Sequence, residues 1–307
     1  MVEWAKRKQL SIAPEKSTIT FFTPDKARQS RVHPQVFING VAIPLDKTPK
    51  ILGVRFDTHY NFSAHVMDVV KKTRSKYGIL HGLAGTGWGC QKETLLQVYK
   101  TYVEPSINYG AAVWAPNISE TSFNSLQRLQ NRALRIATGC HSNASVSHLH
   151  HESKVTLVKE HLQMLSAQML VKCNRISHPS NALVNEPSGP RRMKQTLSTK
   201  HFDEISQFLT NGVIELDDFK PALNSLHTSA VRKSIDKLGP NPLLGVVPPP
   251  IAPSEKTLSR LQRSTLSQLR SGQCHLLNDY KVLTGRGTSA VCPECKIRRH
   301  TVPHLFE

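Results

Sequence analysis

Residues 122–139 read SFNSLQRLQNRALRIATG, and this stretch decides the fold because its apolar side chains recur at helical spacing. The residues predicted to face a core are Leu126, Leu129, Ala133 and Ile136. Gly139 comes next, and glycine is the residue type that most often ends a helix in the left-handed conformation. Arg128, Arg132 and Arg135 fall at positions i, i+4 and i+7 and form a separate stripe. The stretch therefore predicts an amphipathic helix with one buried face and one basic face.

Helical periodicity continues on both sides of this stretch. A helix is predicted after Tyr60, and glycines between 82 and 89 break it. Its predicted core positions are Val66, Val69, Val70, Thr73, Tyr77 and Leu80. A second helix is predicted over about 92–103 and ends at Glu104, since the residue before a proline avoids the helical region. A buried apolar run follows over 107–114. A further helix is predicted over about 157–173, with Leu162, Leu165, Met169 and Leu170 inward.

The first 58 residues have strand and turn signals instead. Short runs of β-branched and aromatic residues are separated by prolines, and Asn39-Gly40 lies between two of these runs. An Asn-Gly pair in this setting is the strongest local signal for a tight hairpin. The predicted fold class is therefore α+β, with a short antiparallel sheet followed by a mainly α-helical part.

The pattern weakens after residue 177. Residues 178–253 contain many prolines, including the run 248–250, which is typical of a semi-rigid linker with short helical pieces. A last basic helix is predicted to open at Ser254. It carries Arg260, Arg263 and Arg270 ahead of a tail with cysteines and histidines. The predicted organisation is a sheet over 1–58, helices over 59–177, a linker over 178–253 and a basic helix with its tail over 254–307.

The composition restricts the class of partner. Lys and Arg number 40 and Asp and Glu 22, which gives a formal charge of +18. Such a surface favours phosphate or another polyanion. No run of about 18 apolar residues exists, and the first residues lack the apolar segment of a signal peptide, so we expect an intracellular protein with no membrane partner. Six cysteines in 307 residues do not form a disulfide scaffold.

The C-terminal tail carries zinc-ligand residue types. Cys292 and Cys295 are separated by two residues, so that both sulfurs could reach one ion from a single turn, and His304 follows nine residues later. Structural zinc sites have four ligands, and three are present here in the right order; a fourth at the next position would lie just past Glu307. The alternative is a frayed tail without metal.

Two other clusters are weaker candidates. His148 and His150 could converge on an ion, but Glu152 is the only carboxylate nearby, so a solvated polar loop is favoured. Asp217 and Asp218 resemble an aspartate pair for two-metal phosphoryl transfer. No apolar strand precedes them, and exposed surface acids are therefore favoured.

Basic residues on several predicted helices could bind a nucleic-acid backbone. Lys71 and Lys72 on the first helix and the arginine stripe at 128–135 could line a channel for phosphates. The alternative for any one stripe is a solvated helix face. Three basic helices in a chain of +18 favour phosphate binding.

Five motifs, taken in chain order, resemble one known family. Residues 4–18 (WAKRKQLSIAPEKST) and residues 50–57 (KILGVRFD) with His65 resemble the region after the catalytic Asp-Asp pair in reverse transcriptases of non-LTR retrotransposons, jockey-like group. Residues 99–114 and 126–139 resemble the thumb of that family. The segment from Arg270 to Tyr280, with the Cys/His tail, is similar to its C-terminal basic segment and zinc knuckle.

The resemblance implies roles for particular residues. Lys16 falls where the family has a lysine near the outgoing pyrophosphate, a candidate general acid; a solvated lysine at a turn is the alternative. Leu52 and Gly53 match a primer-grip hairpin, where glycine allows close approach of backbone to the primer. The resemblance makes 1–58 the end of the palm and 59–177 the thumb. It implies RNA or an RNA–DNA hybrid as partner, contacted by the thumb and by Arg270.

The same resemblance sets the expected limits on activity. In the family an aromatic-x-Asp-Asp sequence holds two Mg²⁺ ions for nucleotide addition. We expect this chain to be a fragment without that sequence. Magnesium then belongs to the intact parent polymerase, with its upstream polymerase and endonuclease domains, and the fragment alone is not expected to polymerise. The alternative function is a stand-alone basic scaffold that binds nucleic acid or protein without enzymatic activity.

Overall fold

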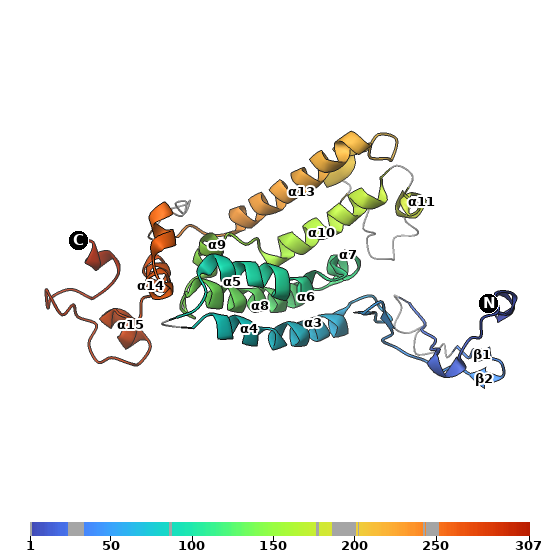
Figure 1. Ribbon diagram of the computed structural model, residues 1–307, viewed down its shortest axis with the longest axis horizontal. Helices are drawn as coiled ribbons and strands as arrows, with labels where there is room; N and C mark the ends of the chain where they lie inside the picture. The colour runs from blue at the N-terminus through green and yellow to red at the C-terminus, as the bar shows by residue number, and fades with distance from the viewer. Residues whose placement is uncertain are drawn as a thin grey trace.

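The computed structural model describes residues 2–23, 34–85, 88–175, 178–185, 201, 203–241, 243 and 252–307. The proline run at 248–250 and the prolines at 187 and 190 lie outside these residues. Two-stranded sheets and a mainly helical remainder confirm the α+β fold class (Figure 1). The described helices include none that is long and apolar enough to cross a membrane.

The N-terminal part consists of short elements at one end of the molecule, and Val54 of its last strand joins the apolar core of the helices (Figure 1). Its elements are α1 (Val2–Arg7), the 3-10 turn Pro14–Lys16, β1 (Phe37–Ile38), β2 (Val41–Ala42), β3 (Lys50–Ile51) and β4 (Val54–Arg55). The two strand pairs are antiparallel hairpins. Asn39 and Gly40 have φ of 51° and 80°, the left-handed values that a tight two-residue turn requires. The predicted Asn-Gly hairpin is therefore confirmed.

The central part is a bundle of helices, called the bundle below. Its elements are α3 (Ser63–Ser75), α4 (Tyr77–Leu83), α5 (Lys92–Val98), the π-helix Tyr99–Val103, α6 (Pro105–Asn108), α7 (Ala111–Trp114), the 3-10 turn Ala115–Asn117, α8 (Glu120–Thr138), α9 (Val146–Ser153) and α10 (Val158–Cys173). One apolar cluster runs through it, and Trp114, Tyr99 and Leu126 are fully buried there.

Helix α8 follows the sequence prediction closely. Leu126 and Ala133 are fully buried, and Gly139 ends the helix in the left-handed conformation with φ of 75°. At the other end the Ser119 side chain accepts a hydrogen bond from the backbone N–H of Ser122, which satisfies a free donor of the first turn. The prediction of an amphipathic helix over this stretch is confirmed.

The predicted helix end at Glu104 is wrong. Glu104 has helical φ and ψ of −58° and −37°, and the chain passes through a π-helix directly into α6. Pro105 occupies the first position of α6, where its missing N–H would have no partner in any case. Two further sequence predictions are wrong. Met169 is exposed and does not face the core. The basic helix predicted to open at Ser254 begins instead after its capping residue Ser259.

The region predicted to be a linker contains a long helix. The described elements after α10 are α11 (Asn181–Asn185), the 3-10 turn Ser206–Phe208, α13 (Leu216–Lys237), the 3-10 turn Pro253–Thr257, α14 (Arg260–Arg270), α15 (Asn278–Leu283) and the 3-10 turn Pro303–Leu305. Helix α13 has 22 residues and packs along α10 (Figure 1). The prediction of short helical pieces is wrong here. Ala222, Leu226 and Ala230 recur every four residues and are buried, and this periodicity outweighs Pro221 within the helix.

The contact between α10 and α13 contains a titratable group with a strongly shifted pKa. Burial lowers the pKa of His161 on α10 to about 4, with a smaller contribution from His227 on α13. The unfolded value is near 6.5, so between about pH 6.5 and 4 the unfolded chain binds a proton that the folded chain does not. Stability therefore falls as the pH drops through this window. When the pH falls from 7 to 4.5, the unfolding free energy of the wild type should therefore drop by about 2 kcal/mol more than that of His161→Gln, after allowance for the partial exposure of His161.

Urea unfolding at a series of pH values measures this difference. The wild type also contains Glu104, whose pKa burial raises to about 7, and its effect on stability has the opposite sign. Glu104 is common to both proteins and cancels in the comparison. His81→Gln changes an exposed histidine of α4, away from His161, and is the matched control. Parallel pH profiles for wild type and His161→Gln would contradict the prediction.

Candidate nucleic-acid interface

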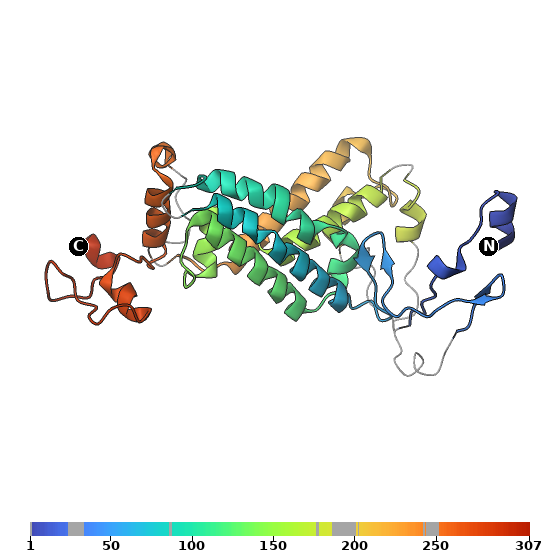
Figure 2. The same cartoon turned by 60° about the horizontal axis from the view of Figure 1, so that its bottom comes forward.

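A groove lies between α3 and α8, which run side by side in the same direction (Figure 2). Its volume is about 890 Å³. The first turns of the two helices contribute hydroxyl groups, and later turns contribute cations. The lining residues are Ser63, Val66, Met67, Asp68, Val70, Lys71 and Arg74 from α3 and Ser119, Thr121, Ser122, Ser125, Arg128, Leu129 and Arg132 from the start and body of α8.

Four cations line this groove: Lys71, Arg74, Arg128 and Arg132. All four are exposed, and none takes part in an ion pair recorded among the described residues. The guanidinium of Arg132 lies 5.6 Å from the ring centroid of Tyr77, which leaves its outer edge toward solvent. These cations are spaced along two neighbouring helices, an arrangement that can contact successive phosphates of a backbone.

The acid in the groove has a partner of its own. Asp68 accepts a hydrogen bond from Nε of Arg55 in β4 at 2.8 Å. Arg55, which is not one of the four groove cations, therefore largely balances the charge of Asp68.

The structure brings together three of the cations that the sequence predicted. Lys71, Arg128 and Arg132 share the groove, and Arg74, which the prediction left out, joins them from the next turn of α3. The signal for Arg74 is its spacing of three residues from Lys71, which places both on one side of a helix. Lys72 is exposed but does not line the groove.

Arg135 is engaged within the protein. Its guanidinium is partly buried and donates a hydrogen bond to the carbonyl of Ala144 at 3.1 Å. Burial lowers the pKa of Arg135 from its ordinary value. It holds the connection between α8 and α9 and does not line the groove.

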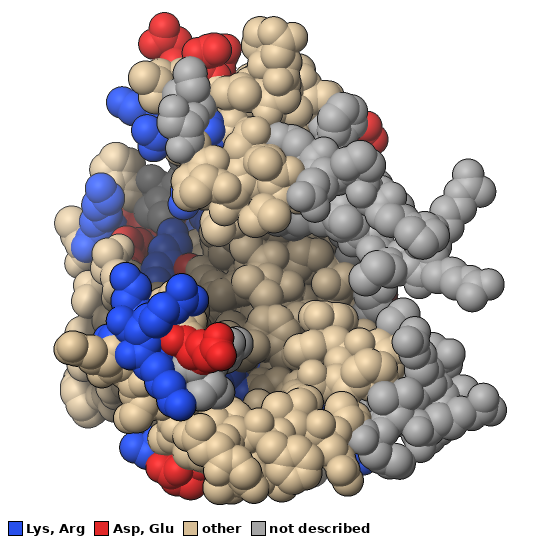
Figure 3. Space-filling model, turned by 90° about the vertical axis from the view of Figure 1, so that its right-hand side faces the viewer, with Lys and Arg blue, Asp and Glu red and all other residues tan. Residues whose placement is uncertain are grey.

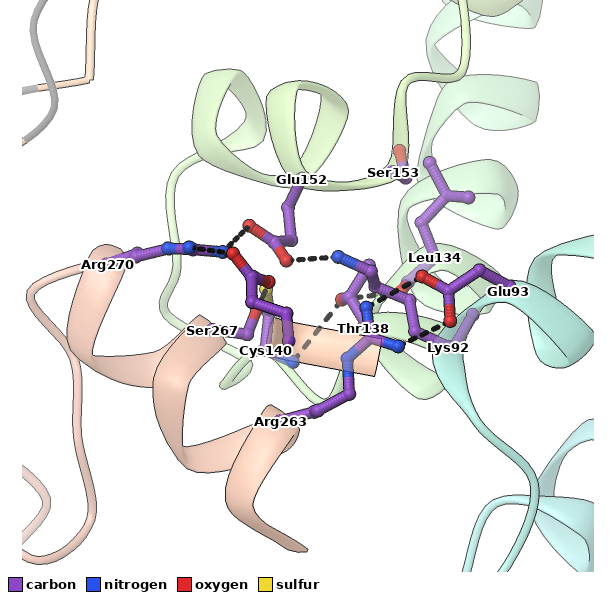
Figure 4. Close-up of polar contacts among 12 residues, drawn as sticks. Lys92, Glu93, Leu134, Thr138, Cys140, Glu152, Ser153, Arg263, Ser267 and Arg270 are labelled. Carbon is purple, nitrogen blue, oxygen red and sulfur yellow. Dashed lines mark hydrogen bonds and ion pairs between the residues drawn. The ribbon is translucent and has the colours of Figure 1, made fainter. Parts of the chain in front are cut away.

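Arg270 lies in a network of charges at the far end of the bundle (Figure 4). It forms an ion pair with Glu255 at 2.5 Å and approaches Glu152 at 3.7 Å. The hydrogen bond with Glu255 raises the pKa of Arg270. Its charge is therefore balanced by carboxylates within the chain, unlike the charges of the groove.

The hairpin β3–β4 presents its tip to solvent. Leu52 is 87% exposed, and its carbonyl accepts a hydrogen bond from the Tyr109 hydroxyl at 2.7 Å. Gly53 has φ of 84°, and a Cβ there would lie 3.2 Å from the Tyr109 ring, so the site favours glycine. Lys16, the candidate general acid, is exposed at the end of the 3-10 turn Pro14–Lys16, and no described residue forms an ion pair with it.

The view onto the N-terminal end shows how charge is distributed there (Figure 3). Lys and Arg side chains gather toward one side of this end, with acidic side chains among them, and the middle of the face is mostly uncharged. The positive charge at this end is therefore unevenly distributed. Lys16 of this end and the four groove cations alike have no ion-pair partner among the described residues.

The Cys/His tail brings its predicted ligands together. One ligand atom each from Cys292, Cys295 and His304 lies within 4.8 Å of the others, and this is the only such group of three among the described residues. The backbone N–H groups of Arg298 and Ile297 lower the pKa of Cys295 to about 7. The Nδ1 atom of His304 is buried without a hydrogen-bond partner. Two thiols and an imidazole are a zinc-type donor set, and the residues present therefore fit three ligands of such an ion.

The other two clusters are not metal sites. His148 and His150 lie in α9 and are buried, so the expectation of a solvated loop is wrong. His150 is hydrogen bonded to the Val155 carbonyl at 2.7 Å, and its burial lowers its pKa, as expected for a neutral core histidine. Asp217 and Asp218 are exposed in the first turn of α13, as predicted.

Comparison with known proteins identifies a class. Curated relatives of this chain are RNA-directed DNA polymerases of non-LTR retrotransposons, which confirms the resemblance read from the motifs. Neither a family model nor a solved structure matches the chain.

Three relatives come from Drosophila melanogaster. The probable RNA-directed DNA polymerase from transposon X-element is 27% identical over 193 residues, which cover 63% of this chain and 21% of that protein. The probable RNA-directed DNA polymerase from transposon BS is 25% identical over 53% of this chain and 18% of that protein. The RNA-directed DNA polymerase from mobile element jockey is 25% identical over 65% and 22%. The chain thus spans about a fifth of the length of these relatives.

Proposed function

We propose that this chain is the C-terminal part of a non-LTR retrotransposon reverse transcriptase, with the end of the palm, the thumb, the linker and the tail, and that it acts inside the cell by binding the sugar-phosphate backbone of RNA or an RNA–DNA hybrid. The relatives, which are RNA-directed DNA polymerases, support the class. The groove between α3 and α8 supports the binding. The hairpin tip at Leu52 and Gly53 is exposed and available as a primer contact.

One observation carries the proposal. The cations of the groove, Lys71, Arg74, Arg128 and Arg132, have no recorded ion-pair partner, whereas Arg263 and Arg270 of α14 pair with carboxylates. A cation already paired with a carboxylate of the chain gains little binding free energy from a phosphate. An unpaired cation that faces the groove gains more. The groove gathers four such cations on two neighbouring helices, which suits it to a polyanion.

The chain's own residues do not provide the chemistry of nucleotide addition in this proposal. Two-metal phosphoryl transfer needs carboxylates that converge on the ions, and Asp217 and Asp218 are exposed on a helix surface. Magnesium and primer extension would then depend on acidic residues of the parent polymerase outside this chain. Lys16 stays a candidate for protonating the leaving pyrophosphate in that assembly.

A salt series with a labelled RNA–DNA hybrid tests the proposal. Four phosphate contacts predict a slope of log affinity against log salt of about −3.6, at roughly 0.9 per contact. A primer-extension assay with Mg²⁺ on the same preparation should give no product. Absence of binding at about 50 mM salt would favour a protein-binding scaffold instead. Primer extension that persists after repurification would contradict the proposal, because this chain would then itself supply the catalytic carboxylates.

The second part of the proposal is a zinc ion at the tail. Cys292, Cys295 and His304 would hold it, and it would fix the tail by tying its two ends together. We expect the purified chain to retain about one equivalent of Zn²⁺ after dialysis, and Cys292→Ser to lose it, because one of the thiolate ligands is removed. Metal analysis of the dialysed protein measures this.

A matched control separates loss of a ligand from loss of any thiol. Cys90 lies in the loop before α5, outside the group of three, and Cys90→Ser should keep the zinc content of the wild type. Equal zinc content in Cys292→Ser and wild type would refute a zinc site at these residues.

A further inference from the structure

The last part of the chain is joined to the bundle by polar contacts. Residues 252–307, called the C-terminal arm below, contribute no member to either apolar cluster of the helices. The arm has a small cluster of its own, made of Cys274, Leu277, Tyr280 and Val302 with Leu269 against it. Among the described residues, docking of the arm therefore depends on hydrogen bonds, ion pairs and one ring contact, in which Tyr280 of α15 meets His141 edge-on at 4.5 Å between centroids.

Helix α14 makes the central contacts of this interface. The Arg260 guanidinium donates to the carbonyls of Ala137 and Ile136 at 2.7 and 2.8 Å, where α8 ends. These carbonyls belong to the last turn of a helix, which leaves them without partners inside it. Ser267 Oγ lies 3.0 Å from Cys140 Sγ. Cys140 is thereby covered by the arm.

The close fit leaves no room for a side chain at Gly139. A Cβ on Gly139 would lie 2.4 Å from Oγ of Ser264 in α14. The glycine that ends α8 thus also permits the arm to dock.

The ion pairs of the interface are divided between its two sides (Figure 4). Lys92 pairs with Glu152 at 2.5 Å, and both belong to the bundle. Arg270 pairs with Glu255 at 2.5 Å, and both belong to the arm. The close pair that crosses the interface is Arg263 with Glu93, bidentate at 2.5 and 2.7 Å. The contact of Arg270 with Glu152 is longer, at 3.7 Å.

This division lowers the cost of separating the two sides. Removing one partner of a buried pair is costly because it leaves a buried charge uncompensated. Here Glu152 would keep Lys92 and Arg270 would keep Glu255. The side chain of Glu93 is already 48% exposed and would be hydrated. Among the cations, Arg260 and Arg263 would lose their partners, and neutral contacts such as those of Gln268 with the Gly139 carbonyl and of Tyr280 with His141 would be exchanged for water.

Phosphate can replace those partners. Guanidinium binds phosphate in the same bidentate geometry that it uses with a carboxylate. Arg260 and Arg263 are both nearly fully buried while the arm is docked, so they are hidden from a ligand in that state.

We propose that the C-terminal arm is a releasable strap: a nucleic-acid backbone takes over Arg260 and Arg263 from the bundle, the arm undocks as a unit, and α14 becomes a second phosphate-binding surface. The identity of the polyanion rests on the proposed function. The release itself follows from the polar interface and from the way its charges are divided.

Labelling of Cys140 measures release on the full chain. Burial raises the pKa of its thiol, so alkylation by iodoacetamide is slow while the arm is docked. We expect labelling, mapped by mass spectrometry, to accelerate several-fold when an RNA–DNA hybrid is added at low salt. Cys173 in α10 and Cys274 in the arm core are buried and should not change, which distinguishes undocking from unfolding.

A substitution at the crossing pair sharpens the test. Glu93→Gln should raise Cys140 labelling without any polyanion and reduce the further effect of the hybrid. Glu15→Gln changes an exposed carboxylate of the N-terminal part and should behave as wild type. Cys140 labelling that Glu93→Gln leaves unchanged would overturn the strap.

The same samples separate the strap from the proposed function. Hybrid binding is followed by fluorescence anisotropy, and inorganic polyphosphate serves as a polyanion without duplex geometry. Binding of the hybrid with unchanged Cys140 labelling would overturn the strap and leave the function standing. Labelling that polyphosphate accelerates, with no binding of the hybrid, would support the strap and overturn the function.

Discussion

The double substitution Arg128→Glu with Arg132→Glu weakens binding of an RNA–DNA hybrid roughly a hundredfold, because each reversal removes an attraction and adds a repulsion of the order of 1 kcal/mol in a solvated groove. Both side chains lie on the exposed face of α8, and neither has a recorded ion-pair partner. The salt slope should also fall, by about 1.8 for two lost contacts. Anisotropy titrations over a salt series measure both quantities.

The matched control carries the same change in net charge on another helix. Lys220→Glu with Arg232→Glu reverses two exposed cations of α13 that lie outside the groove. If net charge alone determines binding, the two double variants lose affinity equally, and the groove has no special role. A large loss in the α8 variant alone would locate the contact at the groove.

Arg128 lines the groove, whereas Arg135 does not. Helical spacing predicts one stripe for both side chains. Arg135 nevertheless bonds the Ala144 carbonyl, and that carbonyl reaches it only because the chain turns back after Gly139. Periodicity along one helix carries no information on which neighbouring segment supplies an acceptor.

The same reasoning applies to the arginines of α14. The sequence shows Arg260, Arg263 and Arg270 as basic residues on an amphipathic helix. Their partners, such as Glu93, lie far away in the sequence, and only the folded chain brings them together. By contrast, hairpins, caps and helix faces are local properties, and the prediction of the Asn39-Gly40 turn and of the face of α8 was confirmed.

Helix α13 and the histidines of α9 were missed for a related reason. A high proline content lowered the expectation of helix over 178–253, although Leu226 and its neighbours recur at helical spacing in one part of it. His150 was read as polar and therefore solvated. Its burial is supported by polar partners on α8 such as Asn131, which the sequence does not place beside it. Residue type alone is a weak predictor of burial for histidine.

Substitution of Trp114 by alanine has the largest expected effect on stability, about 3–5 kcal/mol of unfolding free energy. The side chain is fully buried, its Nε1–H donates to the Tyr109 carbonyl at 3.0 Å, and its ring meets the His65 ring edge-on at 5.4 Å between centroids. It therefore ties α7 to α3 and to the connection that carries the hairpin contact at Tyr109. Removing it leaves a cavity that the surrounding helices can close only in part.

Urea unfolding followed by circular dichroism measures this loss, and two variants show its origin. Trp114→Phe keeps most of the buried ring and removes the hydrogen bond, so we expect a smaller loss, about 1–2 kcal/mol. Trp88→Ala changes a side chain that is 70% exposed and should stay within about 0.5 kcal/mol of wild type. If Trp114→Ala unfolds at the wild-type urea concentration, the bundle core does not run through α7.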